Sequence, residues 1–216
     1  MRKLVVAMMV LVGFTTIAHA QQDAKAKTIL AAVSKKYKSY KYIKTEFSFT
    51  LSNPKANVKE TQQGVLYVKV NSNKYKVSMT NQELYSDGKT QWTYLKKDKE
   101  VQVGNVDNSS DAINPAKIFT VYESGFKYLY TGEKKVGKKT YQMIDLTPIN
   151  GKKAIFKVRL SIDKAANQIA SAVLFDKNGN TYTYNVKSFA PNSSMLESTF
   201  TYDAKAHPGV EVVDLR

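Results

Sequence analysis

Two neighbouring stretches decide the fold of this chain: residues 64–70, with the sequence GVLYVKV, and residues 85–94, with the sequence YSDGKTQWTY. Both alternate apolar and polar residues, which is the period of a β-strand with one buried and one exposed face. The second stretch contains Asp87-Gly88, a strong hairpin signal, because glycine adopts positive φ angles without steric cost. We therefore expect antiparallel strands joined by short turns.

The same alternation extends over most of the chain. It is strictest at residues 154–162, and residues 176–180, with the sequence DKNGN, indicate another hairpin turn. The pattern predicts roughly nine to eleven strands between residues 43 and 202, the last of them at residues 200–202. A sheet of this size must curl or close. We expect a mainly β fold, a single large curved antiparallel sheet that forms an unclosed β-barrel.

Two segments have a helical pattern instead. Asn114-Pro115 is typical of a helix start, since asparagine caps the first turn and proline suits the first helical position, so a short helix is predicted from there through Phe119 towards Glu123. Residues 24–40 carry lysines on one side and apolar residues at helical spacing on the other, namely Ile29, Leu30, Val33, Tyr37 and Tyr40. We expect both helices to cover the concave face of the sheet, where an apolar cavity could hold a hydrophobic ligand.

The first twenty residues have the pattern of a signal peptide. Two basic residues follow Met1, residues 4–18 are mostly apolar and uncharged, and residues 18–20 match the small-x-small pattern of a cleavage site. A membrane anchor is the alternative, but such a stretch is shorter than the about 20 residues that a spanning helix needs. We expect cleavage after Ala20, which gives a signal peptide at 1–20 and one exported domain at 21–216.

Composition excludes several kinds of site. The chain has no cysteine, so disulfides, thiol catalysis and cysteine-based zinc sites are excluded, and an exported chain without cysteine is more typical of a bacterial envelope than of animal secretion. The formal net charge is +15, and nearly all of it comes from lysines spread along the chain. Such lysines form either a solvated surface or one that is weakly attracted to anionic membranes. We expect no nucleic-acid partner for an exported protein.

Few residues suit catalysis. His19 leaves with the signal peptide, so a metal site or a Ser-His-Asp arrangement would depend on His207 alone, and no nucleophile-elbow or phosphate-binding glycine motif is present. The carboxylates that could serve a glycosidase fall on polar faces or at strand ends, where solvated charges are expected; they are Glu46, Glu60, Glu83 and Glu100. We therefore expect neither an enzyme nor a metal or cofactor. The 14 tyrosines and 9 phenylalanines can pack an ordinary β core or line an apolar cavity.

Several motifs together resemble the LolA-type outer-membrane lipoprotein carriers of Gram-negative bacteria, and the resemblance covers nearly the whole mature chain. The motifs that carry it are Phe47, Gly64-x-Leu66, Ser86-Asp87-Gly88-Lys89-x-x-Trp92-x-Tyr94, Asn114-Pro115, Leu146-Thr147-Pro148 and Phe200 with Pro208-Gly209-Val210. The resemblance implies an unclosed β-barrel covered by helices and located in the periplasm, without enzymatic activity or cofactor. Proteins of this family take mature lipoproteins from an inner-membrane ABC exporter, shield their acyl chains and deliver them to the outer membrane.

The resemblance also implies partners and site residues. We expect acylated lipoproteins, the inner-membrane exporter, and either an outer-membrane receptor or the membrane surface itself to contact a monomeric carrier. The candidates for the wall that binds acyl chains are Phe47, Phe49, Leu66, Val68, Tyr75, Val77, Met79 and Trp92. The candidates for the lid are Ile113, Pro115, Ile118 and Phe119. For each of these residues, plain core packing is the alternative.

Two other functions fit parts of the pattern. A relative of the same fold could sense lipids or lipoproteins in envelope-stress signalling, but such sensors usually carry an additional domain, so we expect the carrier. An envelope hydrolase is the other alternative, and the shortage of histidine and cysteine argues against it.

The chain departs from the family at one position. In the best-known branch, an arginine followed by proline comes after the Gly-x-Leu strand, and the arginine helps to latch the lid. Val70 and Asn71 occupy these positions here, with one apparent inserted residue before Tyr75. We therefore predict a lid that is held mainly by apolar contacts.

Replacing Val70 with arginine tests this prediction. Because the substitution adds a long charged side chain where the latch would lie, Val70→Arg is expected to change lid opening or lipoprotein release. The measurement is the rate at which bound lipoprotein leaves the purified carrier. An unchanged rate would remove the support for an apolar lid.

Overall fold

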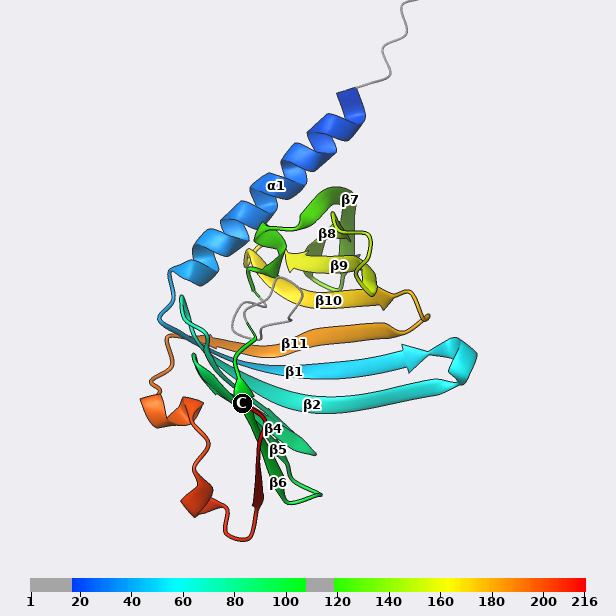
Figure 1. Cartoon of the computed structure of the whole chain (residues 1–216). Helices are drawn as coiled ribbons and strands as arrows, with labels where there is room; N and C mark the ends of the chain where they lie inside the picture. The colour runs from blue at the N-terminus through cyan, green and yellow to red at the C-terminus, as the bar shows by residue number, and fades with distance from the viewer. Residues whose placement is uncertain (1–16, 108–118) are drawn as a thin grey trace, which may run out of the picture.

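The computed structural model describes residues 17–107 and 119–216, and its main element is one sheet of twelve strands. The strand order is β12-β6-β5-β4-β3-β2-β1-β11-β10-β9-β8-β7, so β12 and β7 lie at opposite edges and the barrel is not closed (Figure 1). The strands are β1 Tyr42–Asn53, β2 Val58–Lys69, β3 Lys74–Met79, β4 Gln82–Asp87, β5 Thr90–Leu95, β6 Glu100–Asn105, β7 Phe126–Val136, β8 Lys139–Pro148, β9 Ile155–Asp163, β10 Gln168–Asp176, β11 Thr181–Pro191 and β12 Glu211–Asp214. The mainly β, unclosed architecture expected from the sequence is confirmed.

Short turns join most neighbours in the sheet, as the alternation predicts. The hairpin between β4 and β5 turns at Gly88, whose φ of 99° explains the need for glycine there. The β10–β11 turn likewise has Gly179 at φ 85°. β1 pairs with both β2 and β11, which brings the two halves of the chain side by side at the centre of the sheet.

The last strand was predicted in the wrong place. Residues 200–202 form no strand; a 3₁₀ helix, η4 (Glu197–Phe200), ends there instead, and the final strand is β12, which pairs in parallel with β6. The apolar residues at 200–202 serve as anchors, because the buried Phe200 ring stacks on Tyr42 with 6.4 Å between ring centroids. Tyr202 packs in a separate cluster with Tyr85 and Val101.

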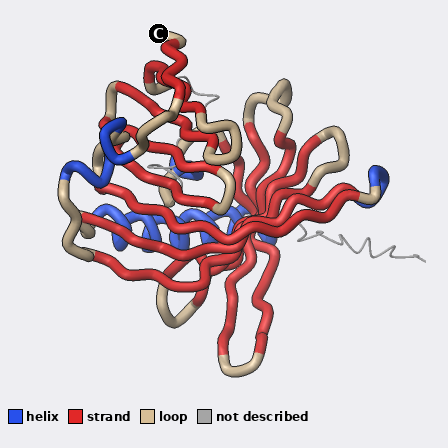
Figure 2. Tube along the Cα trace, turned by 90° about the horizontal axis from the view of Figure 1, so that it is seen from below, coloured by secondary structure: helices blue, strands red, loops and turns tan. Residues whose placement is uncertain are grey.

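The single α-helix of the described residues, α1 (Ile17–Lys38), begins seven residues earlier than the pattern predicts. It lies beside the half of the sheet that contains β7 to β10, and the view from below shows it along one side of the strands (Figure 1 and Figure 2). Its buried residues recur at helical spacing, as predicted: Ala26, Ile29, Leu30, Val33 and Tyr37. Each large apolar side chain buried in this way stabilises the fold by about 1.5–3 kcal/mol. None of the helices in the described residues has the length and apolar character needed to cross a membrane.

Polar contacts fix α1 both to the sheet and to the segment that precedes β7. The backbone N–H of Ile169 in β10 donates to the hydroxyl oxygen of Tyr37 at 3.1 Å. The hydroxyl of Ser34 donates to that of Tyr122 at 3.0 Å, and Tyr122 is part of the 3₁₀ helix η3 (Val121–Glu123). The sequence predicts an α-helix reaching Glu123; its described end is a turn followed by η3, and residues 108–118 lie outside the described residues.

An ion-pair network holds β3, β4 and β5 together on the side of the sheet away from α1. The carboxylate of Glu83 accepts hydrogen bonds from the hydroxyls of Tyr85 and Ser78, and it pairs with Lys96 at 3.0 Å and Lys76 at 3.3 Å. Burial alone would raise the pKa of Glu83, but these hydrogen bonds and the two cations lower it to about 2. Glu83, a catalytic candidate by residue type, is therefore a structural ion here.

The lowered pKa of Glu83 makes stability depend on pH. Because the folded pKa of about 2 lies below the ordinary value of 4.5, its contribution is present above pH 4.5 and is lost as the pH falls towards 2. We expect Glu83→Gln to lower the free energy of unfolding at neutral pH by about 1–3 kcal/mol, and to flatten the loss of stability in acid.

The measurement is urea unfolding of both proteins at several pH values between neutral and 2. Glu60→Gln, at an exposed carboxylate, is the matched control and should leave the curve near the wild type. Equal effects of the two substitutions would contradict a structural role for the Glu83 network.

Candidate functional site: an apolar cavity on the inner face of the sheet

One face of the sheet bounds a cavity of about 1530 Å³, and we call this face the inner face. The cavity follows the strand period, because alternate residues of neighbouring strands line it. In β1, for example, the lining residues are Ile43, Thr45, Phe47 and Phe49. The curvature of the sheet therefore converts one apolar face of the predicted strands into a continuous concave wall.

Six of the eight residues predicted for the wall line this cavity. They are Phe47, Phe49, Leu66, Val68, Val77 and Met79. They come from three adjacent strands, β1, β2 and β3, and the register places Leu66 beside Val77. Their binding of acyl chains remains a prediction.

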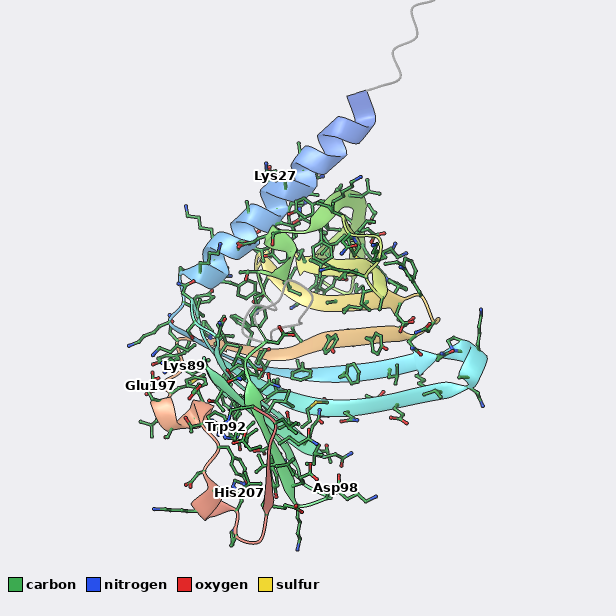
Figure 3. All side chains as sticks on the ribbon, viewed as in Figure 1. Lys27, Lys89, Trp92, Asp98, Glu197 and His207 are labelled. Atoms are coloured by element: carbon green, nitrogen blue, oxygen red, sulfur yellow. The ribbon has the colours of Figure 1, made fainter. Side chains whose placement is uncertain are left out.

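The other two predicted wall residues lie elsewhere. Tyr75 is only 2% exposed and packs in the main core, where its hydroxyl donates to the side chain of Gln91 at 2.7 Å. Trp92 pairs with Tyr85 across β4 and β5 and packs in the Tyr85 cluster, on the outer face of the sheet. Figure 3 shows Trp92 near His207, where the C-terminal segment runs beside β4 to β6. Alternation does not show which apolar face of β5 borders the cavity, because side chains of other segments cover both faces of the sheet.

The predicted wall does not include the residues of β8 to β11 that form another part of the cavity lining. They include Leu146, Val158, Leu160, Ala172, Leu174, Tyr184 and Val186. The sequence shows the alternation of β9, but this alternation predicts that Phe156 and Val158 lie on the same face of the strand. In the structure, β9 and β10 change register where Asp176 pairs with Ile155, so Ile155 lines the cavity while Phe156 is 46% exposed.

Phe119 is the one predicted lid residue among those that the structure describes. Its buried ring stacks on Tyr37 of α1, with centroids 4.5 Å apart, and meets Phe189 of β11 edge-on at 6.0 Å. Both Phe119 and Tyr37 line the cavity. The other predicted lid residues, Ile113, Pro115 and Ile118, lie outside the described residues. The contacts of Phe119 are thus aromatic and apolar, at the boundary between α1 and the cavity.

The family's latch position lies at the border of the cavity. Val70 lines the cavity and packs against the main core, and Asn71, which follows it with φ 57°, also lines the cavity. An arginine at position 70 would therefore reach the cavity space, which makes the Val70→Arg experiment a direct test of the lid.

Several polar groups at the cavity bond to other parts of the protein. The buried hydroxyl of Thr45 donates to the backbone oxygen of Ser188 at 2.8 Å. Burial raises the pKa of Tyr37 well above its usual range, so this hydroxyl stays neutral. Lys38 and Glu123, both at the cavity, form an ion pair at 2.6 Å. The wall therefore suits a long apolar ligand, since it presents mainly hydrocarbon surface.

The candidate catalytic residues do not assemble at the cavity. The ring of His207 packs against Tyr94 and Tyr202, with centroids 4.9 Å and 4.8 Å away, and does not line the cavity. The four candidate carboxylates also lie outside the cavity lining; they are Glu46, Glu60, Glu83 and Glu100. Within residues 17–107 and 119–216, no three His, Asp or Glu side chains form a group that could hold a metal ion.

The glycine of the Gly-x-Leu motif makes room for an aromatic ring of the wall. Gly64 pairs with Phe47 across β1 and β2, and a Cβ built on Gly64 would lie 2.5 Å from the Cζ atom of Phe47. β1 also has a register shift against β11 between Glu46 and Phe47. The tip of the Phe47 ring therefore occupies the space above a glycine, next to a β-bulge.

Adding one methyl group at Gly64 should disturb this packing. We expect Gly64→Ala to push the Phe47 ring towards the cavity and to lower the free energy of unfolding by about 1–3 kcal/mol, the usual cost of overpacking. Gly104→Ala in β6 is the matched control, since no atom lies within 4 Å of the built Cβ, and its effect should stay within about 0.5 kcal/mol. Denaturant unfolding measures both, and equal effects would contradict the proposed packing.

Comparison with solved structures supports the architecture. A conserved protein from Thermus thermophilus has a TM-score of 0.55 at 15% identity, covering 88% of this chain and 99% of its own. A DUF1329 family protein from Desulfovibrio piger has a TM-score of 0.50 at 12% identity, covering 83% and 98%. A LolA superfamily protein from Nitrosomonas europaea has a TM-score of 0.46 at 12% identity, also covering 83% and 98%. At these identities the likeness of the first two concerns the fold alone.

Comparison of sequences identifies the family. No curated protein sequence matches the chain at a significant level. Residues 38–203, however, match the family model described as outer membrane lipoprotein carrier protein LolA. The match begins at the end of α1 and extends past Tyr202, so it includes every strand that lines the cavity. The chain belongs to the LolA family of outer membrane lipoprotein carrier proteins.

Proposed function

We propose that this chain is a periplasmic carrier that holds the acyl chains of lipoproteins in its cavity and transfers them from the inner-membrane exporter to the outer membrane. The observation that supports this function best is the apolar cavity of about 1530 Å³ on the inner face. Sites for small molecules usually measure about 300–1,000 Å³. The larger volume and its mainly hydrocarbon wall suit one or more long acyl chains.

The energetics of acyl chains explain why such a carrier is needed. Burying a 16-carbon chain of about 15 methylenes is worth roughly 12 kcal/mol, at about 0.8 kcal/mol for each methylene. An acyl chain therefore does not cross an aqueous compartment unshielded. The carrier has to offer comparable apolar surface and then release the chain, which an unclosed sheet permits more easily than a sealed barrel.

Export is part of the proposal. Cleavage after Ala20 would remove the first four residues of α1 and leave a helix that starts at Gln21. All the buried residues named for α1, from Ala26 to Tyr37, would remain in place. The mature helix would thus still cover its half of the sheet.

Native mass spectrometry of the protein purified from periplasm tests the carrier function. We expect acylated lipoprotein to copurify, because the cavity would otherwise expose its apolar wall to water. A species free of lipoprotein under all purification conditions would contradict the proposal. Transfer of the bound lipoprotein to acceptor vesicles then separates a carrier from a sensor of the same fold, since a sensor would retain its ligand.

A matched pair of substitutions on β10 tests whether the cavity is the binding site. Leu174 lines the cavity, whereas its neighbour Val173 points to the opposite face. We expect Leu174→Gln to weaken binding of a fluorescent acylated peptide about tenfold, because a polar amide would be buried against the acyl chain. Val173→Gln should change binding less than twofold, on the order of the scatter for a surface substitution. Equal losses would place the binding site elsewhere.

A further inference from the structure

Three turns lie side by side at one end of the sheet. They join β1 to β2, β8 to β9 and β10 to β11, and Figure 1 shows the first and third at the right-hand edge of the molecule. Asn53 donates through its side-chain amide to the side-chain oxygen of Asn180 at 2.8 Å, which ties the first turn to the third. The ammonium of Lys177 donates to the backbone oxygen of Gly151 at 2.6 Å, which ties the third turn to the second.

This end of the molecule is strongly basic. We define the basic rim as residues 53–60, 148–157 and 175–181, which contain six lysines and two acidic residues. One of the acids, Asp176, is buried and accepts hydrogen bonds at 2.8 Å from the backbone N–H groups of Asn178 and Asn180. Its charge is therefore directed inward. The lysines that are exposed are Lys55, Lys59, Lys152 and Lys177.

Exposed apolar side chains accompany these lysines. Ile149 is 64% exposed and Phe156, at the register shift of β9, is 46% exposed. A shallow depression of about 360 Å³ lies between the turns, and Lys55, Phe156 and Lys177 are among its lining residues. Cationic and apolar groups thus share one surface, the combination found where proteins contact the boundary between lipid headgroups and acyl chains.

The basic rim also borders the cavity. Lys152 and Lys153 line it together with Ile155, so the same turn that carries Ile149 forms part of the cavity mouth. A ligand that leaves the cavity at this end would pass directly between the lysines and the exposed apolar side chains.

We propose that the basic rim docks the cavity mouth onto a bilayer surface that contains anionic phospholipid. The lysines pair with the headgroup phosphates, and Ile149 and Phe156 enter the interface beside them. This orientation presents the opening of the cavity to the membrane, so an acyl chain moves between protein and bilayer without crossing water. The inference rests on the proposed carrier function, but membrane docking is measured without any bound lipoprotein.

Vesicle cosedimentation of the mature protein tests the docking surface. We expect binding to vesicles of phosphatidylglycerol and phosphatidylcholine, little binding to phosphatidylcholine alone, and weaker binding at high salt because salt screens the charges. The triple variant Lys55→Glu, Lys59→Glu, Lys152→Glu should weaken binding to the anionic vesicles by at least about tenfold. The matched control is Lys27→Glu, Lys89→Glu, Lys97→Glu, which makes the same charge change at exposed positions elsewhere and should cost less than about threefold.

Each other outcome overturns the docking surface. Equal losses in the two triple variants would mean that the total charge acts and the rim does not, and equal binding to neutral and anionic vesicles would remove the role of the lysines. Absence of binding by the wild type to anionic vesicles would likewise exclude a lipid surface as the partner. Binding of the fluorescent acylated peptide in solution, measured on the same proteins, tests the carrier function separately, because it involves the cavity and no membrane.

Discussion

The fold depends on one requirement: the apolar inner face of a large open sheet has to be covered without being filled. Protein interiors are normally packed to the density of organic crystals. Here α1 packs against one half of the sheet through side chains such as Val33 and Tyr37, and the space beyond them remains as a cavity of about 1530 Å³. The stacked rings of Tyr37 and Phe119 lie at this boundary. Stability and binding capacity therefore come from different parts of the same apolar face.

The outer face and the edges are protected by other means. The C-terminal segment covers the outer face through Phe200 and Tyr202, and Glu197 on this segment pairs with Lys69 and Lys74. An open sheet exposes unpaired backbone groups at both edges, which invites association with other chains. β12 is a strand of only four residues, and β7 carries three lysines, so neither edge offers a long uncharged template. These features reduce the tendency of the open sheet to pair with other chains.

Much of the fold was predictable because strand alternation and turn chemistry are local properties. Residues 64–70 and the turn at Gly88 were sufficient to predict antiparallel strands, and the spacing of apolar residues predicted the buried side of α1. The sequence did not show which apolar side chains face the cavity. That depends on whether α1 or the C-terminal segment covers a given part of the sheet, and these contacts are distant in sequence. Trp92 belongs to the outer cluster for this reason, and Phe156 faces outward because the register shift beside Asp176 changes the alternation. The role of residues 200–202 as anchors depends on contacts distant in sequence, which no local pattern contains.

The position of Trp92 has a spectroscopic consequence. It is the sole tryptophan of the chain, and it lies in the cluster that Tyr202 joins on the outer face, away from the cavity wall. Its intrinsic fluorescence will therefore report detachment of the C-terminal segment and will stay nearly silent when the cavity is occupied. Tyrosine emission does not separate the two layers, because Tyr37 and Tyr184 border the cavity while Tyr85, Tyr94 and Tyr202 lie in the outer cluster. The protein thus contains one intrinsic optical probe that is specific for its outer layer, without any added label.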